Sequence, residues 1–367
     1  MKKVYQLILA VTTIVVMNAC NQTESCDDVN CLNDGICIDG DCECPDGFSG
    51  PNCEISSFEE RNGVFVLNEG NFNGGNASLS FYNKNSEMMS NGVFTSVNSI
   101  PLGDVAQSME IRDGKGYIVV NNSGKVEVVN LSDLSSAGTI TGLTSPRYIT
   151  FVSNTKAYVS DLFSGTVSIF DPQTLAVSGG VSISGQVEQM EYVGGNVIVA
   201  GSGANMVYKL NPATDALTDS VNVGVGPSNL AVDMNGKVWV LTNGGFGTEV
   251  PKLVRINPSN LSIELTLDFP STNNYPGNLE IDGSGTSLFF VDGQVFKMSI
   301  ADVALPSAPF ASAFAYKCGV DPIEGLVYIS DAGDFNSNGS VYRYQADGTP
   351  VDTFAVGVIP AEYAFTE

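Results

Sequence analysis

The stretch "SNLAVDMNGKVWVLTN" (228–243) contains two short apolar runs separated by a turn sequence. The runs "SNLAV" and "VWVLTN" are rich in Val, Leu and Trp, and neither shows a helical period. The intervening "DMNGK" supplies Asp, Asn and Gly, the residue types that favour tight turns. This pattern predicts two consecutive antiparallel β-strands.

Related first runs recur along the chain from residue 57 onward. Each follows a loop that contains Gly or Pro, and aligned positions are 39 to 49 residues apart. Second and third apolar runs follow each of the first six, and a weaker fourth closes each unit. Four strands in a repeat of this length are typical of a β-propeller blade. The aligned residues are Met109, Tyr148, Met190, Leu230, Leu279, Cys318 and Tyr363.

The two ends of the repeat region are incomplete in complementary ways. The first unit has "VFVLNEG" (64–70), "ASLSFY" (77–82) and "VFTSV" (93–97) as second, third and fourth strands but lacks a first. The last run, "AEYAF" (361–365), has no unit of its own. Pairing it with the first unit leaves no open sheet edge. We predict an all-β, seven-bladed propeller closed by a strand from each terminus; a parallel β-helix would leave these ends unmatched.

Ring closure also explains a repeated loop. "GNFN" (70–73) and "GDFN" (333–336) both follow a second strand, one in the first blade and one in the seventh. Blades one and seven touch in a closed ring. We therefore expect these two loops to be neighbours on the rim.

The start of the chain resembles a bacterial lipoprotein signal. A basic start precedes a mostly apolar stretch, residues 4–17, that is too short to span a bilayer comfortably. It ends in "MNAC" (17–20), which resembles the lipobox that precedes a lipidated cysteine. We expect a signal peptide at 1–19, lipidation of Cys20 and a tether at 20–25. An ordinary secretory signal is the alternative.

Six cysteines lie close together after this signal. Such a density in an exported chain predicts a disulfide framework and argues against a zinc site, although spacing alone leaves the pairing open. "CLNDGICIDGDCECPDGFSGPNCE" (31–54) resembles an EGF-like module of the short tenascin type, whose typical ending matches Cys42, Cys44 and "PDGFSGPNC" (45–53). The resemblance implies a module at 26–54, without calcium because residues 21–25 lack the acidic pattern. It also implies the pairs Cys26–Cys37, Cys31–Cys42 and Cys44–Cys53.

Composition excludes several classes of function. The net charge is −24 with only 16 basic residues, so a nucleic-acid partner is not expected. The chain contains no histidine, which excludes His-dependent triads, His-ligated zinc and axial His ligation of haem. The remaining cysteine, Cys318, lies in an apolar stretch, and we expect it to be a buried hydrophobic residue.

The propeller, expected at 57–367, resembles two groups of proteins. "GPSNLAVDMNGKVWVLTNGG" (226–245) and "AYVSDLFSGTVSIFDPQT" (157–174) look like YVTN-type propellers. "GVFVLNEGNFNGGNASLSFYNKNS" (63–86) resembles surface lipoproteins of Gram-negative bacteria that work beside TonB-dependent outer-membrane transporters. Members of that group hold vitamin B12, and related ones hold siderophores. The resemblance implies a lipid-anchored protein of the outer membrane, exposed at the cell surface.

Two sets of loops carry the candidate binding residues, because function in such folds resides in loops on a rigid scaffold. One set places a polar residue before each aligned inner-strand position. Inner strands that line a water-filled channel would also carry polar residues there without any ligand. The other places phenylalanines between Gly and Asn, where they form an apolar rim unless they fold back as loop anchors. The polar set is Ser108, Arg147, Gln189, Asn229, Asn278, Lys317 and Glu362; the rim set is Phe72 with Asn73, Phe163, Phe246 and Phe335.

The loop "DFNSNGS" (334–340) is also a weak calcium candidate. Asp334, Asn336 and Asn338 match the opening of an oxygen-rich calcium loop, but Gln345 stands where a glutamate is expected.

We expect a non-enzymatic protein that captures a bulky cofactor or chelate, cobalamin first and a siderophore second. The expected partners are this cargo and a TonB-dependent transporter. No resident cofactor is required, and the membrane is contacted through the lipid alone. An adhesive EGF-propeller protein is the alternative, and a propeller hydrolase or lactonase is a weaker one.

Overall fold

The computed structural model describes residues 26, 29–32, 35–44, 48, 49, 51–53, 55, 56 and 62–366. The chain divides into two compact units, Met1–Glu54 and Ile55–Glu367. The expected signal peptide at 1–19, Cys20 and the tether at 20–25 lie outside the described residues. Among those described, no helix has the length and apolar character needed to cross a membrane.

The N-terminal unit is rich in disulfides. Its strands are β1 (Ile36–Ile38), β2 (Asp41–Glu43) and β3 (Phe48–Ser49), and Cys37 of β1 faces Cys42 of β2 across an antiparallel pair. The structure contains the three disulfides that the EGF-like resemblance implies: Cys26–Cys37, Cys31–Cys42 and Cys44–Cys53.

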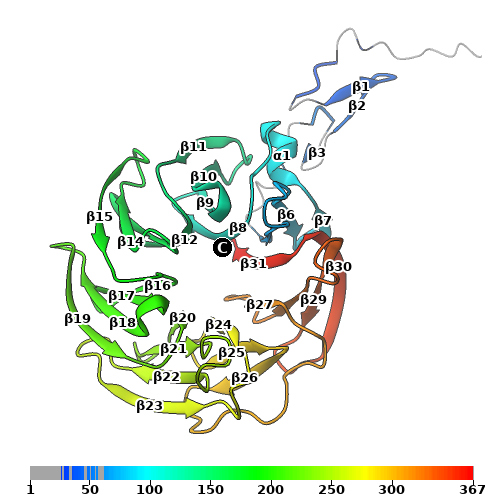
Figure 1. Ribbon diagram of the computed structural model, residues 1–367. Helices are drawn as coiled ribbons and strands as arrows, with labels where there is room; N and C mark the ends of the chain where they lie inside the picture. The colour runs from blue at the N-terminus through cyan, green and yellow to red at the C-terminus, as the bar shows by residue number, and fades with distance from the viewer. Residues whose placement is uncertain are drawn as a thin grey trace, which may run out of the picture. The chain divides into compact units, whose positions relative to one another are not determined.

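The second unit is a ring of seven antiparallel sheets around a central axis, which confirms the predicted propeller (Figure 1). It begins with β4 (Ile55–Ser56), before the blades. The innermost strands, from blade one to blade seven, are β31 (Pro360–Phe365), β8 (Ala106–Arg112), β12 (Pro146–Ser153), β16 (Met190–Val193), β20 (Pro227–Val232), β24 (Gly277–Ile281) and β27 (Lys317–Val320). The second strands are β5 (Gly63–Asn68), β9 (Lys115–Val120), β13 (Lys156–Asp161), β17 (Asn196–Gly201), β21 (Val238–Thr242), β25 (Ser287–Asp292) and β28 (Val327–Asp331).

The outer part of each blade is built from the remaining strands. The third strands are β6 (Ser78–Asn83), β10 (Lys125–Asn130), β14 (Thr166–Phe170), β18 (Met206–Asn211), β22 (Lys252–Ile256), β26 (Gln294–Ser299) and β29 (Asn338–Tyr344). The fourth strands are β7 (Met88–Ser90), β11 (Ser136–Ile140), β15 (Val177–Ser182), β19 (Ala216–Asn222), β23 (Ile263–Asp268) and β30 (Pro350–Val358). Blade six has three strands in its sheet, so the expected weak fourth strand is wrong there.

The predicted fourth strand of blade one, "VFTSV", is also wrong. This stretch forms α1 (Val93–Asn98), and β7 takes the place of the fourth strand. The apolar residues Val93, Phe94 and Val97 share one face at helical spacing and pack into the core beside blade two. Gly92 and Ser99, both left-handed, bound the helix.

The ring closes where the two ends of the propeller meet. β31 pairs with β5 in antiparallel register, with Phe365 opposite Val64 and Tyr363 opposite Val66. The backbone N–H of Gly63 donates to the hydroxyl of Thr366 at 2.7 Å, and this bond extends the pairing to the end of the two strands. The predicted closure is therefore confirmed.

Apolar side chains fill the space between neighbouring sheets. Each of the seven buried clusters draws residues from adjacent blades, so every blade depends on its neighbours for a complete core. Cys318 lies in the cluster between blades six and seven and is 2% exposed, as the sequence predicts. Burial raises the pKa of its thiol well above the usual value.

Deleting residues 360–367 should prevent folding of the propeller, because it exposes the edge of β5 and removes core residues such as Tyr363. The measurement is the soluble yield and thermal melting of the truncated protein. A synthetic peptide of residues 359–367, added during refolding, should restore the melt. A soluble truncated protein with an unchanged melting temperature would contradict the closure.

Candidate functional site

The two phenylalanine loops of blades one and seven are neighbours in space, as predicted. The side-chain amide of Asn71, in the loop between β5 and β6, donates to the backbone carbonyl of Phe335 at 2.6 Å. Asn73 continues the contact toward blade two, where its side-chain oxygen accepts from Asn122 at 3.1 Å. Hydrogen bonds thus join the rim loops of three adjacent blades.

The predicted rim phenylalanines lie at the surface. Phe72, Phe163, Phe246 and Phe335 are 71%, 69%, 85% and 42% exposed. Phe246 and Phe335 also have φ values of 57° and 60°, in the left-handed region that bulky residues rarely occupy. The loops therefore hold two large apolar side chains at the surface on strained backbone.

Sequence reasoning missed two aromatic residues beside this rim. Tyr275 stacks on Phe246 with ring centroids 4.8 Å apart and an interplanar angle of 26°. Tyr316 meets Phe335 edge to face at 5.5 Å, and its hydroxyl donates to Glu69 at 2.9 Å. Each tyrosine comes one or two residues before an inner strand, in a loop of the kind that carries the predicted site. An aromatic residue at this position of the repeat could have been recognised in the sequence.

Most polar residues of the predicted ring join one inner strand to the next. The hydroxyl of Ser108 donates to the carbonyl of Arg147, and side-chain oxygens of three others accept from the following strand's backbone. These bonds run from Leu230 to Gln189 at 3.1 Å, from Asn278 to Asn229 at 3.1 Å and from Cys318 to Asn278 at 2.6 Å. Inner strands of different blades do not form a ladder of backbone hydrogen bonds with each other. These side chains connect them instead.

The charged members of the predicted ring, Arg147, Lys317 and Glu362, lie in the first half of their inner strands. Arg147 pairs with Glu188 at 2.9 Å and also donates to Gln107. Lys317 forms no ion pair in the described part of the chain, and its ammonium lies 5.9 Å from the ring centre of Tyr316. Glu362, on β31, is partly buried beside Lys317.

A set of carboxyl groups lines the channel and was missed at the sequence level. Glu110 is exposed to the channel, but partial desolvation by the surrounding blades and the nearby carboxylates of Glu191 and Glu362 raise its pKa to about 8. Burial likewise raises the pKa of Glu191 and of Glu362 to about 7, and that of Glu280 well above its usual value. The sequence does contain a recognisable pattern, because a glutamate directly follows the aligned residue in three repeats. These glutamates are Glu110, Glu191 and Glu280.

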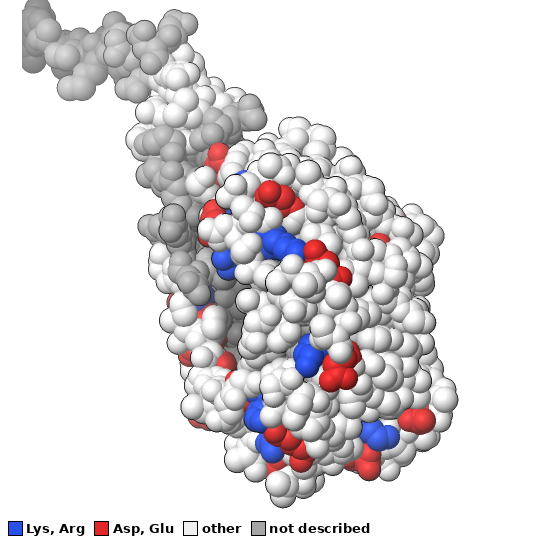
Figure 2. All heavy atoms as spheres, turned by 90° about the vertical axis from the view of Figure 1, so that its left-hand side faces the viewer, with Lys and Arg blue, Asp and Glu red and all other residues white. Residues whose placement is uncertain are grey.

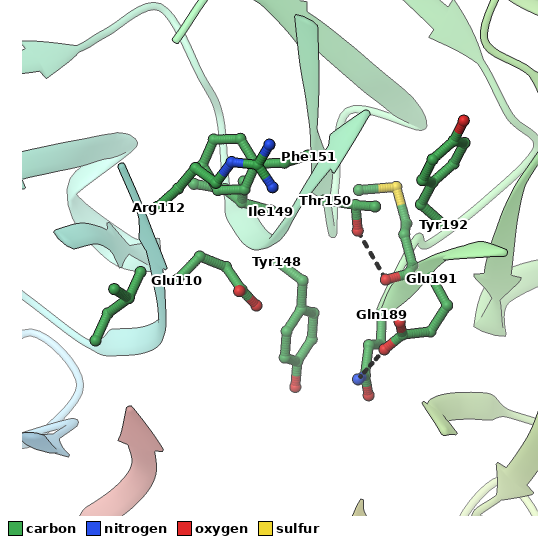
Figure 3. Close-up of a pocket in the computed structure, with 11 residues that line it drawn as sticks. Glu110, Arg112, Tyr148, Ile149, Thr150, Phe151, Gln189, Glu191 and Tyr192 are labelled. Carbon is green, nitrogen blue, oxygen red and sulfur yellow. Dashed lines mark hydrogen bonds between the residues drawn. The ribbon is translucent and has the colours of Figure 1, made fainter. Parts of the chain in front are cut away.

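One pocket opens on this channel between β8, β12 and β16 (Figure 3). Its volume is about 290 Å³, and it is lined by aromatic rings and carboxyl groups. Thr150 and Gln189 hydrogen-bond within the wall, to Met190 and Glu191 respectively. Of the predicted site residues, only Gln189 lines it.

The loop proposed as a weak calcium site uses its carboxylate internally. Asp334 accepts from the backbone N–H groups of Asn336 at 2.9 Å and Ser337 at 2.7 Å. These bonds lower the pKa of Asp334. Asn338 opens β29. Within the residues that the structure describes, no group of three or more acidic or Cys side chains is placed to hold a metal ion.

Charge on the side of the molecule drawn in Figure 2 is sparse and mixed. Basic side chains lie beside acidic ones, and most of this face is uncharged. Ion pairs of this kind include Lys156 with Asp215 at 2.7 Å and Lys237 with Glu264 at 2.5 Å. This face therefore presents no continuous basic surface.

Comparison with protein families decides where the chain belongs. A family model described as a domain of unknown function, DUF5074, matches residues 62–365. The chain belongs to the DUF5074 family. A comparison with curated proteins found no match.

Solved structures similar to this DUF5074 protein are distant in sequence. A quinoprotein alcohol dehydrogenase-like protein from Bacteroides thetaiotaomicron has a TM-score of 0.65 at 14% identity, covering 84% of this chain and 79% of that one. A candidate 6-phosphogluconolactonase from Bacteroides fragilis has a TM-score of 0.62 at 13% identity, covering 84% and 99%. A functionally unknown protein from Desulfotomaculum acetoxidans scores 0.62 at 14% identity, covering 83% and 99%. At these identities the likeness concerns the fold alone.

The channel carboxyls predict how stability depends on pH. The raised pKa values of Glu110, Glu191 and Glu362 mean that the folded DUF5074 propeller binds more protons than the unfolded chain between about pH 4.5 and 8. The contribution of these three groups to the free energy of unfolding should therefore be greatest below this window and fall as the pH rises through it. Thermal melting across this range measures the effect.

Replacing all three glutamates with glutamine is the control for this prediction. The triple variant should show a flatter dependence of melting temperature on pH, because the groups that titrate are gone. A wild-type melting temperature that rises from about pH 5 to 8 would contradict the prediction.

Proposed function

We propose that this DUF5074 propeller is a ligand-capture protein whose rim binds a bulky, partly flat molecule. The observation that carries the proposal is the group of exposed phenylalanines, two of them held on left-handed backbone. Backbone strain of this kind costs about 1–3 kcal/mol for each residue, so it persists where the surrounding structure enforces it. A large apolar side chain kept in water by such a loop suits a partner that will cover it.

The rim supplies both apolar and polar contacts. Phe246 with Tyr275 forms one stacked pair, and Phe335 with Tyr316 forms a second aromatic pair next to Phe72. Aromatic pairs of this kind pack against planar or multi-ring ligands. Lys317 and Arg147, at the adjacent channel mouth, can donate hydrogen bonds to acidic or carbonyl groups on the ligand's edge.

Cobalamin is our first choice of ligand, and a ferric siderophore is the second. Both are large, multi-ring or chelate structures with polar edges, and both suit an aromatic rim beside amide and cationic donors. Haem is a poorer choice, because the chain has no histidine to act as an axial ligand. The amides of Gln189, Asn229 and Asn278 contribute less than the rim, since they already hydrogen-bond between blades.

The same proposal places the protein at the outer membrane, held by a lipid on Cys20. The support is the sequence "MNAC" (17–20) after an apolar stretch, followed by a disulfide framework that requires an oxidising compartment. The propeller would then pass its ligand to a TonB-dependent transporter.

The test of the rim is titration calorimetry with cobalamin. Replacing Phe72 and Phe335 with alanine together should weaken binding by more than about tenfold, because each buried aromatic anchor contributes about 2 kcal/mol. The matched control is Ile323→Ala, an exposed apolar residue in the turn between β27 and β28, at the other end of blade seven. It should bind like the wild type.

Each outcome separates one interpretation from the others. No heat at a high micromolar concentration of cobalamin rejects that ligand. Tight binding that survives the double change rejects the rim and points to the channel mouth. Release of a converted product indicates an enzyme such as a lactonase, and binding to macromolecules alone indicates an adhesive protein.

The lipid anchor has its own test. Cys20→Ser should move the protein from the membrane fraction to the soluble fraction, because lipidation requires the cysteine thiol. Fractionation of cells that express both forms, followed by mass measurement of the mature wild-type protein, checks this. A serine variant that stays with the membranes would rule out the lipoprotein assignment.

A further inference from the structure

The pocket of Figure 3 is separate from the proposed rim site. Its lining comes from the inner strands themselves, such as Glu110–Arg112 of β8 and Met190–Tyr192 of β16, with Gln189 just before β16. The rim tyrosines Tyr275 and Tyr316 instead precede the starts of their inner strands, β24 and β27. The pocket therefore lies farther along the channel, away from the phenylalanine loops.

Two carboxyl groups in this pocket have no cationic partner. Glu110 forms no hydrogen bond or ion pair within the described residues, and Figure 3 shows its carboxyl group directed into the open space. Glu191 accepts a hydrogen bond from Gln189 at 3.2 Å and forms no ion pair there. The carboxyl of Glu362 faces the same channel from β31 and adds further negative charge.

The one cation in the pocket wall is already engaged. Arg112 lies beside Asp113, with 3.5 Å between the charged groups, and donates to Asn154 at 3.1 Å. Its guanidinium also lies 5.9 Å from the ring centre of Phe151. Arg112 therefore leaves the charge of Glu110 and Glu191 uncompensated.

Aromatic rings complete the wall. Tyr148, Phe151 and Tyr192 line the pocket. Figure 3 shows the ring of Tyr148 between the carboxyl groups of Glu110 and Glu191. The faces of aromatic rings attract cations, and the attraction grows when the site excludes water. Phe151 already holds a guanidinium group in this way, so the wall displays the interaction itself.

We propose that this pocket binds a small organic cation, with an alkylammonium or guanidinium group placed between Glu110 and Glu191 and against the ring of Tyr148. The volume of about 290 Å³ matches a small molecule. A bare metal ion fits the site less well, because the described residues offer no cluster of three acidic or Cys ligands. Organic cations, in contrast, are held by carboxylates together with aromatic faces.

Binding should depend on pH in a defined direction. The groups that face Glu110 are Glu191 on β16, Glu362 on β31 and the ring of Tyr148 on β12, with Arg112 at the edge. Because the pKa of Glu110 is raised to about 8 and that of Glu191 to about 7, both carboxyls are largely protonated near pH 6. A cation requires the ionised forms, so its affinity should rise between about pH 6 and 8.5.

The experiment is a titration of the purified protein with n-butylammonium, followed by calorimetry and by NMR of the ligand. The neutral analogue 1-butanol is the ligand control. Glu110→Gln and Glu191→Gln should each weaken binding about tenfold and reduce its pH dependence, since each removes a charge close to the ligand. Glu280→Gln is the matched protein control, because it makes the same carboxyl-to-amide change in the same channel but outside the pocket; it should change affinity by less than about twofold.

Tyr148→Leu provides a second variant, at a half-buried position whose hydroxyl accepts a hydrogen bond from Gln107. It should weaken binding about threefold or more through loss of the ring face. Three results would overturn the proposal. These are no binding at about 20 mM n-butylammonium, binding of 1-butanol as strong as that of n-butylammonium, or equal weakening of binding by all three glutamine variants. Equal weakening by all three variants would mean that the cation responds to the overall negative charge of the channel and does not occupy this pocket. None depends on whether the rim binds cobalamin.

Discussion

A sheet with an unpaired edge exposes N–H and C=O groups that can pair with another chain. In this propeller, blade one would have such an edge along β5 if the end of the chain did not return to cover it. The register that places Phe365 opposite Val64 also positions Tyr363 in the core between blades seven and one. Because each blade packs only on its neighbours, this one pairing sets the geometry of the whole ring.

The constraint of closure also shapes the channel. Inner strands of different blades have no common backbone ladder, so side chains must join them, and Gln189, Asn229 and Asn278 do this by accepting from the next strand. Carboxyl groups that are not used in this way remain in the channel, where partial desolvation raises the pKa values of Glu110 and Glu191. The ring therefore separates two kinds of surface: an aromatic rim on loops and an acidic channel on strands.

Repeat spacing and the two incomplete ends were sufficient to predict the seven blades and their closure. The same reasoning failed at α1, because Val93, Phe94 and Val97 fit either period, and only packing against the core distinguishes a helix from a strand. It also failed to distinguish a side chain that joins blades from one that could meet a ligand. Asn229 and Lys317 occupy equivalent aligned positions, yet their partners depend on where the next inner strand lies.

The pairing of β31 with β5 has a consequence for the order of folding. Residues 63–90 are synthesised early, but their sheet acquires its inner strand only when the last residues of the chain become available. Such a contact between distant parts of a sequence is slow to form, because a long loop must close first. Blades two to seven contain only strands that are near one another in sequence, so their sheets can form locally. We therefore expect closure of the ring to be the last step of assembly.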